Sequence, residues 1–255
     1  MSSALTTEVR VPGPVPRWDV PGWTERYGVV AGITGRGEAA EPFDLGLWGR
    51  GPVADSMTRW RAFRHAFPGF PAQVLAHQVH GNKVKWHDHA GEGWTLLDGA
   101  DGHATPVAGL LLLVTVADCI PVFLVAPRQR AVALLHAGWR GTADGILERG
   151  VAILGDRAGA RPEELVCHLG VGISGPAYEV GAEVMAGVGL EHDGPGPWHV
   201  DLREVLSRHA ADLGIGTLSR SGHCTATDAT SFFSHRRSGG ADGRMVAYLG
   251  IPATE

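Results

Sequence analysis

Two histidines and one cysteine interrupt strongly apolar stretches of this chain, each where a strand is expected to end or bend. His80 lies in AHQVHGNKV, Cys119 in VADCIPVFLV and His136 in AVALLHAGWRGT. Zinc accepts thiolate sulfur and imidazole nitrogen in tetrahedral sites, and three protein ligands leave a fourth position for water. Bound zinc either generates hydroxide at neutral pH or polarises a substrate atom. These residue types therefore predict a catalytic zinc site.

Each of the three residues also has a purely structural interpretation. Free cysteine is among the most buried residue types, and a lone histidine in a strand is usually a satisfied structural group. The spacing of the residues favours a shared ion. If Ile120–Ala126 and Ala131–His136 form a hairpin whose partner numbers sum to 255, the β-carbons of Cys119 and His136 lie about 4.5–5.5 Å apart. A slip of one residue would send the two side chains to opposite faces.

Composition and charge restrict the function classes. The chain has 255 residues, of which 44% are hydrophobic and 19% charged, and its formal net charge is -5. It has no basic excess for a phosphate backbone, so we expect no nucleic-acid binding and favour small-molecule chemistry. The three cysteines form no close-spaced framework, and the first residues lack the apolar core of a signal peptide. We therefore expect free thiols and a cytoplasmic location; the sequence does not indicate an oligomeric state.

The apolar run over residues 107–125 approaches the length of about 20 residues that spans a bilayer. Asp118 and Pro121 lie inside this run, and a second apolar stretch follows after only PRQR. This pattern is typical of consecutive buried strands rather than of a membrane span.

Around these residues, the patterns predict a mixed α/β (α+β) fold: one domain over residues 23–255, with central mixed sheets flanked by helices. Residues 1–22 contain four prolines and are predicted to form an N-terminal arm over the surface. Residues 91–105 are interpreted as a loop with a short strand, and Thr142 is predicted to cap a helix over 142–154. The remaining predicted helices are 53–66, 179–188 and 201–213, and the predicted strands are 72–80, 83–86, the apolar pair around Cys119, 165–173, 216–220 and 244–250.

Six short motifs occur in a recognisable order over roughly residues 27–251: HQVHG, DGHAT, ADCIPV, HAGWRGT, YEVG and FFSHRR. In these motifs the chain resembles the zinc-dependent purine nucleoside phosphorylase family. Members of that family have also been described as laccase-domain multicopper polyphenol oxidases and, in bacteria, as peptidoglycan editing factor. The resemblance implies a single α/β domain and a mononuclear zinc ion held by His80, Cys119 and His136.

The same resemblance implies the reaction and the substrates. Members cleave adenosine, inosine or guanosine with phosphate to the free base and ribose 1-phosphate, act on methylthioadenosine, and deaminate adenosine hydrolytically. Phosphorolysis requires cations and amides that hold phosphate below the sugar. Deamination requires an activated water near purine C6, which an open zinc position would supply.

Several residues are candidates for binding substrate or phosphate. Arg140 either faces an anion at the start of the helix or pairs with a surface acid. Asp118 either orients a metal ligand as a hydrogen-bond acceptor or caps a turn. His77 could donate to substrate, although an exposed strand histidine is common. The other candidates for phosphate or base are Arg36, His235, Arg236 and Arg237.

The chain departs from the family pattern at two places. The stretch FDLGLWG has Gly46 where the family commonly has asparagine, so any polar contact from that position is lost. The turn SGPAYEVG has Ala177 where cysteine is frequent, which leaves the proposed ligand set intact. The N-terminal part therefore matches least well, and Arg36 is the weakest assignment.

Three other functions compete with zinc-dependent phosphorolysis. A multicopper centre needs several paired histidine motifs, and only His87-Asp88-His89 has that spacing, although the soft thiolate could still bind copper. Cys119 could instead be the nucleophile of an amidase that edits peptidoglycan precursors. A non-catalytic zinc module would need a fourth protein ligand, such as Cys224 or His168. Otherwise Cys167 and Cys224 are interpreted as core thiols.

Overall fold

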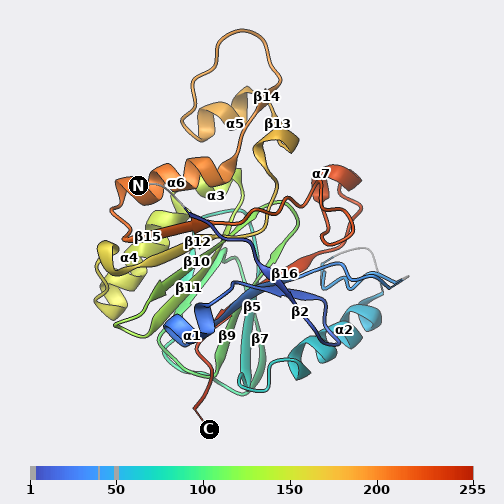
Figure 1. The fold of residues 1–255 in the computed structure, drawn as a ribbon, viewed down its shortest axis with the longest axis vertical. Coiled ribbons are helices and arrows are strands. Elements are labelled where there is room, and N and C mark those ends of the chain that lie inside the picture. The colour runs from blue at the N-terminus through green and yellow to red at the C-terminus, as the bar shows by residue number, and fades with distance from the viewer. Residues whose placement is uncertain (1–3, 40, 49–51, 255) are drawn as a thin grey trace.

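Two seven-stranded sheets form the centre of the molecule (Figure 1). The computed structural model describes residues 4–39, 41–48 and 52–254. The first sheet has the order β1 (Ala4–Leu5), β15 (Thr217–Arg220), β12 (Val166–Leu169), β10 (Ile120–Ala126), β11 (Ala131–Ala137), β8 (Gly102–Thr105) and β6 (Val84–Trp86). The second has the order β2 (Val9–Val11), β3 (Arg17–Asp19), β4 (Val30–Thr34), β16 (Met245–Gly250), β9 (Leu110–Val116), β5 (Ala72–His77) and β7 (Gly93–Asp98).

The sheets pack face to face and are covered by helices on their outer faces. Phe123 and Leu134 of the first sheet share one buried cluster with Leu112 of the second. Helices α4 (Ile146–Ala158) and α6 (Leu202–Asp212) cover the other face of the first sheet, and α2 (Val53–His65) covers the second. Central strands buried on both faces read as continuous apolar runs. This explains why residues 107–125 resemble a membrane span in sequence but are strands in the fold.

The predicted mixed α/β single-domain fold is confirmed, and most predicted elements lie within a few residues of the observed ones. The predicted helix over 142–154 is wrong at its start. Gly145, with a φ of 77°, separates the short helix α3 (Trp139–Ala143) from α4. A positive φ is accessible to glycine at little cost. Thr142 therefore lies inside α3 and does not cap a helix.

The hairpin of β10 and β11 forms as predicted, but its register is different. Ile120 pairs with Ala137 and Pro121 with His136, so partner numbers sum to 257 instead of 255. The shift of two residues keeps Cys119 and His136 on the same face, because side chains alternate with a period of two. In the observed register Ala126 pairs with Ala131, and the four residues 127–130 connect the two strands.

Two segments interpreted as irregular contribute strands. The N-terminal residues do not simply lie over the surface: β1 pairs with β15 in the first sheet, and β2 and β3 extend the second sheet through β4. The segment 91–105 contains both β7 and β8. Tertiary pairing decides the structure of such short segments, which have weak local patterns.

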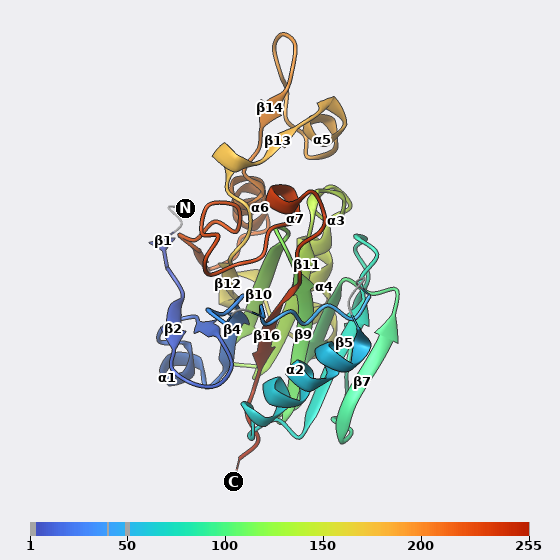
Figure 2. The same ribbon diagram turned by 90° about the vertical axis from the view of Figure 1, so that its right-hand side faces the viewer.

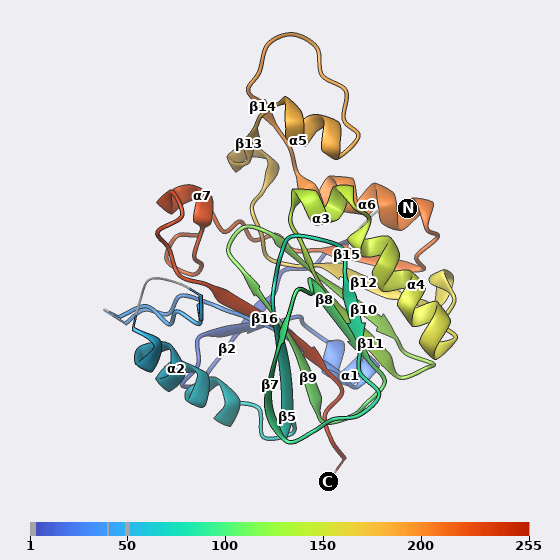
Figure 3. The same ribbon diagram turned by 180° about the vertical axis from the view of Figure 1, so that it is seen from behind.

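A smaller unit projects beyond one end of the strands (Figures 2 and 3). It consists of α5 (Ala182–Gly187) and the two-stranded pair of β13 (Glu179–Val180) and β14 (Trp198–His199). The remaining helices are α1 (Trp23–Tyr27) and α7 (His235–Ser238), with 3-10 turns at Pro162–Glu164 and Gly175–Ala177. None of the described helices has the length and apolar character needed to cross a membrane.

A buried carboxylate connects the N-terminal segment to the first sheet. Glu8 accepts hydrogen bonds from Nε2 of His168 at 3.0 Å and from the hydroxyl of Ser221 at 2.6 Å. Burial opposes the charge of Glu8, but His168 and Ser221 outweigh burial and lower its pKa below the ordinary value. A lowered carboxylate pKa stabilises the fold above the pKa of the unfolded chain, and this contribution is lost as pH falls through the folded value.

We therefore expect Glu8→Gln to lower the free energy of unfolding by about 1–3 kcal/mol near pH 7. The difference between the two proteins should shrink as the pH falls below about 4.5, because the wild-type carboxyl then becomes protonated. Urea unfolding of both proteins between pH 3 and 7 measures it. A difference that stays constant over this range would contradict the assignment.

Candidate metal centre

The candidate metal centre lies at one end of the two-sheet core. Strands β5, β9 and β11 end there, while β8 and β10 begin there, as the pairing registers show. Short segments after β5 and β9 carry His80 and Cys119, and His136 is the second-last residue of β11. In Figure 2, α3 and α7 lie at this end of the strands, below the projecting unit.

His80, Cys119 and His136 come together as the sequence predicts. One ligand atom from each residue lies within 4.8 Å of the others, so the three could hold a metal ion. His136 is buried, Cys119 is partly exposed and His80 is exposed. The cluster is therefore closed on the side of the sheet and open toward solvent at His80.

The backbone around the cluster is held in an uncommon conformation. His80 has a φ of 60° and Asp118, directly before Cys119, has a φ of 94°. Non-glycine residues adopt positive φ infrequently, and local hydrogen bonds must stabilise it. The Gln78 side chain supplies part of this support, because its amide bonds both the backbone and the hydroxyl of Thr115 on β9.

The charges of the cluster stabilise a thiolate. Burial alone would raise the pKa of Cys119, but the charges and hydrogen bonds of His136 and His80 lower it. Burial would likewise lower the pKa of His136, but Cys119 and Asp101 raise it. A cysteine in such surroundings is a nucleophile or a metal ligand rather than an inert core thiol. By contrast, burial raises the pKa of Cys167 to about 12, as expected for a core residue.

Asp118 does not accept a hydrogen bond from a histidine of the cluster. Its Oδ1 accepts from the hydroxyl of Thr225 at 2.6 Å, and its Oδ2 accepts from the backbone N–H of Arg236 at 2.7 Å. Of the two predicted alternatives, capping a turn describes this geometry better. Asp118 connects the segment of Cys119 to α7.

One tyrosine and two arginines lie near Cys119. Burial raises the pKa of Tyr178 to about 12, and the charges of Cys119, Arg236, Asp118 and Arg140 also act on this hydroxyl. The guanidinium of Arg236 lies 5.0 Å from the centre of the Tyr178 ring, and that of Arg140 lies 4.4 Å from the ring of Trp139. The Tyr178 hydroxyl therefore keeps its proton near neutral pH.

The other predicted binding residues are not members of the three-residue group, and most have contacts of their own. His77 bonds Asp98 through Nδ1 at 3.1 Å and packs against exposed Trp48. Arg36 lies over the ring of Phe233 on the segment before α7. His235, at the start of α7, is exposed. Arg237 has a structural role, because it donates to the carbonyl oxygens of Thr225 and Phe232 and to Asp242.

The alternative fourth ligands named from the sequence are engaged elsewhere. His168 is fully buried between Ser219 and Glu8. Cys224 accepts hydrogen bonds from the backbone and hydroxyl of Ser174. Within the described parts of the chain, the only group of three or more metal-binding side chains is His80, Cys119 and His136. A three-ligand set leaves a coordination position open, which is typical of catalytic rather than structural zinc.

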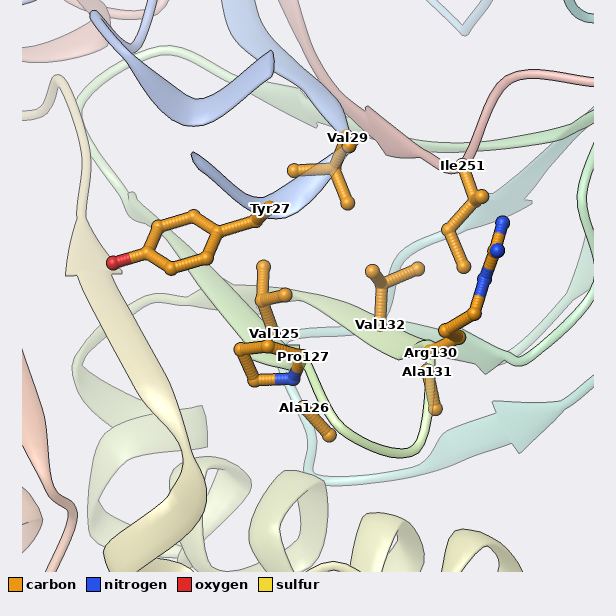
Figure 4. A pocket seen from close by; sticks show the side chains of 10 residues that line it. Tyr27, Val29, Val125, Ala126, Pro127, Arg130, Ala131, Val132 and Ile251 are labelled. Carbon is orange, nitrogen blue, oxygen red and sulfur yellow. The ribbon is translucent and has the colours of Figure 1, made fainter. Parts of the chain in front are cut away.

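A cavity of about 280 Å³ lies away from the cluster (Figure 4). Tyr27, Val29 and Ile251 line it together with Val125 and Val132, near the β10–β11 turn. The cluster lies at the other end of the same hairpin, roughly 20 Å away for strands of this length. This cavity is therefore not part of the metal centre.

Two residues of the centre were in motifs but had no predicted role. Asp101 of DGHAT accepts a hydrogen bond from Nδ1 of His136 at 2.9 Å, and Tyr178 of YEVG lies near enough to Cys119 for its charge to act on the hydroxyl. The signal available for Asp101 is a charged residue directly before a short strand of buried residues. A carboxylate at such a position needs partners, but the sequence does not identify them.

Gly138 leaves space for the cluster. A β-carbon at this position would lie 3.0 Å from Sγ of Cys119 and 3.2 Å from Cδ2 of His80. The φ of Gly138 is -80°, so alanine is allowed by the backbone and only the contacts oppose it.

We expect Gly138→Ala to weaken Zn²⁺ binding roughly tenfold, because the two ligands must move apart from the new methyl group. Competition with a chromophoric chelator measures the affinity. Gly155→Ala is the matched control, since its β-carbon would meet only the Ala160 carbonyl oxygen at 3.4 Å. Equal zinc affinity in both variants would show that Gly138 does not limit the ligand positions.

The fold and the cluster together define a class of protein: a single-domain mixed α/β protein with three side chains that could hold one metal ion at the end of a two-sheet core. Residues 43–252 match the family model described as multi-copper polyphenol oxidoreductase laccase. The chain belongs to this family.

The chain is also similar in sequence to curated proteins and in structure to solved proteins. The chain is 35% identical to the purine nucleoside phosphorylase YlmD of Geobacillus stearothermophilus over 88% of this chain and 90% of that protein. It is 30% identical to YlmD of Bacillus subtilis, which has the same name, over 88% of each chain. The crystal structure of the Geobacillus YlmD superposes with a TM-score of 0.86 over 97% of this chain and 100% of that one, at 28% identity. That of Bacillus licheniformis YfiH gives 0.84 over 95% and 98%, at 25% identity.

Proposed function

We propose that this protein is a zinc-dependent purine nucleoside phosphorylase. Its reaction is the cleavage of adenosine, inosine or guanosine by phosphate to the free base and ribose 1-phosphate. The observation that carries the proposal is the three-residue cluster of His80, Cys119 and His136, which is exposed at His80. Arg140 and Arg236 lie nearby, since both act on the Tyr178 hydroxyl together with Cys119. The names of the relatives support the same reaction.

The donor set of the cluster fits zinc. One thiolate and two imidazoles are ligands that zinc accepts in a tetrahedral arrangement, and the lowered pKa of Cys119 favours the thiolate that it requires. When bound, zinc supplies a Lewis acid and a position for an activated water or a substrate oxygen. The side chains around the ion then determine how phosphate and the nucleoside bind beside it.

Phosphate binding is assigned to the cations at the opening. Arg140 is exposed, and its guanidinium lies over the ring of Trp139. The charges of Arg140 and Arg236 both act on the hydroxyl of Tyr178. Guanidinium groups bind phosphate with two parallel hydrogen bonds, which orients the attacking oxygen. His235 and Arg36 could contribute from the neighbouring segments, and His77 could contact the nucleoside from the end of β5.

The neutral hydroxyl of Tyr178 suits a donor role toward the ribose or the base. Its raised pKa keeps the proton in place near neutral pH. Activity on methylthioadenosine and hydrolytic deamination of adenosine are part of the proposal. Deamination would use water in place of phosphate as the second reactant.

The family description mentions several copper ions, but the ligands in this chain favour one ion. His87 bonds His103 at 3.1 Å, and His103 is buried, so the HxH pair does not extend the cluster in the described residues. Trinuclear copper centres need several paired histidines. A single site with one thiolate and two imidazoles suits zinc.

The direct test combines purified, zinc-loaded protein with inosine, adenosine or guanosine, with and without phosphate, and follows base and ribose 1-phosphate by chromatography. The proposal predicts base release that requires phosphate, with inosine appearing from adenosine as the mark of deamination. Ribose instead of ribose 1-phosphate would identify a hydrolase. No turnover of any of the three nucleosides would overturn the proposal.

A further inference from the structure

The side chain of Asp101 hydrogen-bonds the segments of both histidine ligands. Its side chain is fully buried, and the residue lies directly before β8. Its carboxylate accepts from the backbone N–H groups of Val79, His80 and Gly81 at 2.9–3.1 Å, and from Nδ1 of His136 at 2.9 Å. The backbone carbonyl of Asp101 also accepts from the N–H of His136 at 2.7 Å.

The contact with His136 determines which ring nitrogen can bind a metal. Because the ionised carboxylate only accepts hydrogen bonds, Nδ1 of His136 must carry the proton. In the neutral ring Nε2 is then the nitrogen with a free lone pair, and it is left for the contact of His136 with Cys119. Metal-binding histidines commonly have this arrangement, in which a carboxylate fixes the tautomer and the orientation of the ring.

The contacts with the Val79–Gly81 segment determine the position of His80. Three consecutive N–H groups converge on one carboxylate, and the middle residue has a φ of 60°. Without the anion these amides would have no common acceptor, and the uncommon conformation at His80 would lose its support. Asp101 thus holds the exposed ligand through its backbone and the buried ligand through its side chain.

The charge of Asp101 also bears on the kind of ion. Four N–H donors converge on the Asp101 carboxylate, which is an environment that favours its ionised form. The Cys119 thiolate and the Asp101 carboxylate carry two negative charges beside the site. A divalent ion would neutralise both, whereas a monovalent ion would leave a buried net charge, which is costly.

We propose that Asp101 is the positioning residue of the metal centre: it fixes the tautomer of His136 and the backbone of His80, and thereby sets the affinity for a divalent metal ion. This role rests on the proposed zinc site, but it is separate from the reaction that the site performs.

The test is the Zn²⁺ affinity of Asp101→Asn at pH 7, measured on metal-stripped protein by competition with a chromophoric chelator. The one amide oxygen of asparagine can replace Oδ1, which accepts from His80 and His136, or Oδ2, which accepts from Val79 and Gly81, but not both. We therefore expect the affinity to fall about 10–100-fold. Glu8→Gln is the matched control, because it also removes the charge of a buried carboxylate bonded to a histidine, with no metal ligand nearby. Its affinity should stay within about twofold of the wild type. Co²⁺-loaded Asp101→Asn should also have an altered visible spectrum.

A second measurement needs no variant. In the zinc-loaded wild-type protein, ¹⁵N NMR of the imidazole groups should show His136 protonated at Nδ1 and metal-bound at Nε2. Binding through Nδ1, or equal zinc affinity in Asp101→Asn and the wild type, would overturn the positioning role alone. Zinc binding without phosphorolysis would overturn only the proposed reaction, and absence of zinc binding by the wild type would overturn both.

Discussion

Replacing Cys119 with alanine is expected to reduce phosphorolysis by roughly a thousandfold or more, since a Lewis acid stabilises charge in the transition state by several kcal/mol. The variant should also lose most of its zinc, because the two remaining imidazoles do not provide the thiolate that the cluster stabilises. Initial rates of base release at saturating phosphate, together with the zinc content of the same samples, measure both effects.

Cys167→Ala is the matched control for the loss of a thiol. Cys167 lies fully buried on β12, beside β10, and burial keeps it protonated. This variant should lose about 1 kcal/mol of stability by the removal of buried surface, with rates within about threefold of the wild type. An active Cys119→Ala protein would instead show that the thiolate does not take part in the site.

The second large effect is expected for Asp118→Ala. Its carboxylate holds Thr225 and the backbone of Arg236, and charge-assisted hydrogen bonds of this kind contribute about 1.5–3 kcal/mol each. Without them α7 loses its attachment to the segment of Cys119. We expect the free energy of unfolding to fall by about 2–4 kcal/mol and the KM for phosphate to rise more than that for nucleoside, because Arg236 is displaced.

Asp88→Ala provides the comparison for this prediction. Asp88 bonds Arg157 and Trp86 on the exposed surface, away from the cluster. Exposed pairs contribute little, so this variant should stay within about 1 kcal/mol of the wild type. If Asp118→Ala loses stability but both KM values are unchanged, the assignment of Arg236 to phosphate is wrong.

The cluster of His80, Cys119 and His136 could be predicted from sequence because polar residues of metal-binding type interrupt apolar strands. The exact register could not, since registers whose partner numbers sum to 255 or to 257 both place Cys119 and His136 on the same face and are equivalent in the hydrophobic pattern. The choice between them is made by the tight turn over residues 127–130, where Arg130 adopts a φ of 50°. Turn geometry of this kind is not encoded in the alternation of the strands.

The supporting residues were harder to predict than the ligands. Asp118 stands beside Cys119 in sequence and is the natural candidate for an acceptor near the metal, but its carboxylate is directed toward Thr225 and Arg236. Asp101, distant in sequence from His136, has that position instead because β8 pairs with β11. Partners across a sheet follow from long-range pairing, whereas sequence reasoning favours neighbours along the chain.

The same limit applies to the helix after His136. The pattern from Thr142 to Leu154 is helical, and α4 follows it. However, Gly145 precedes a new helix and leaves Trp139–Ala143 as the separate short helix α3. Gly141 in that helix has the backbone carbonyl of Gly81 only 2.8 Å from where a β-carbon would lie. The close approach of these two segments, rather than helix propensity, determines the local structure.

The most direct test of a single zinc ion at His80, Cys119 and His136 is a titration of metal-stripped protein with Zn²⁺, with phosphate-dependent base release from inosine measured at each step. The proposed function predicts no release before zinc is added and a rate that reaches its maximum at about one ion per chain, as expected for a mononuclear site. Full activity in the metal-free protein, or activity that appears only with several copper ions per chain, would contradict it.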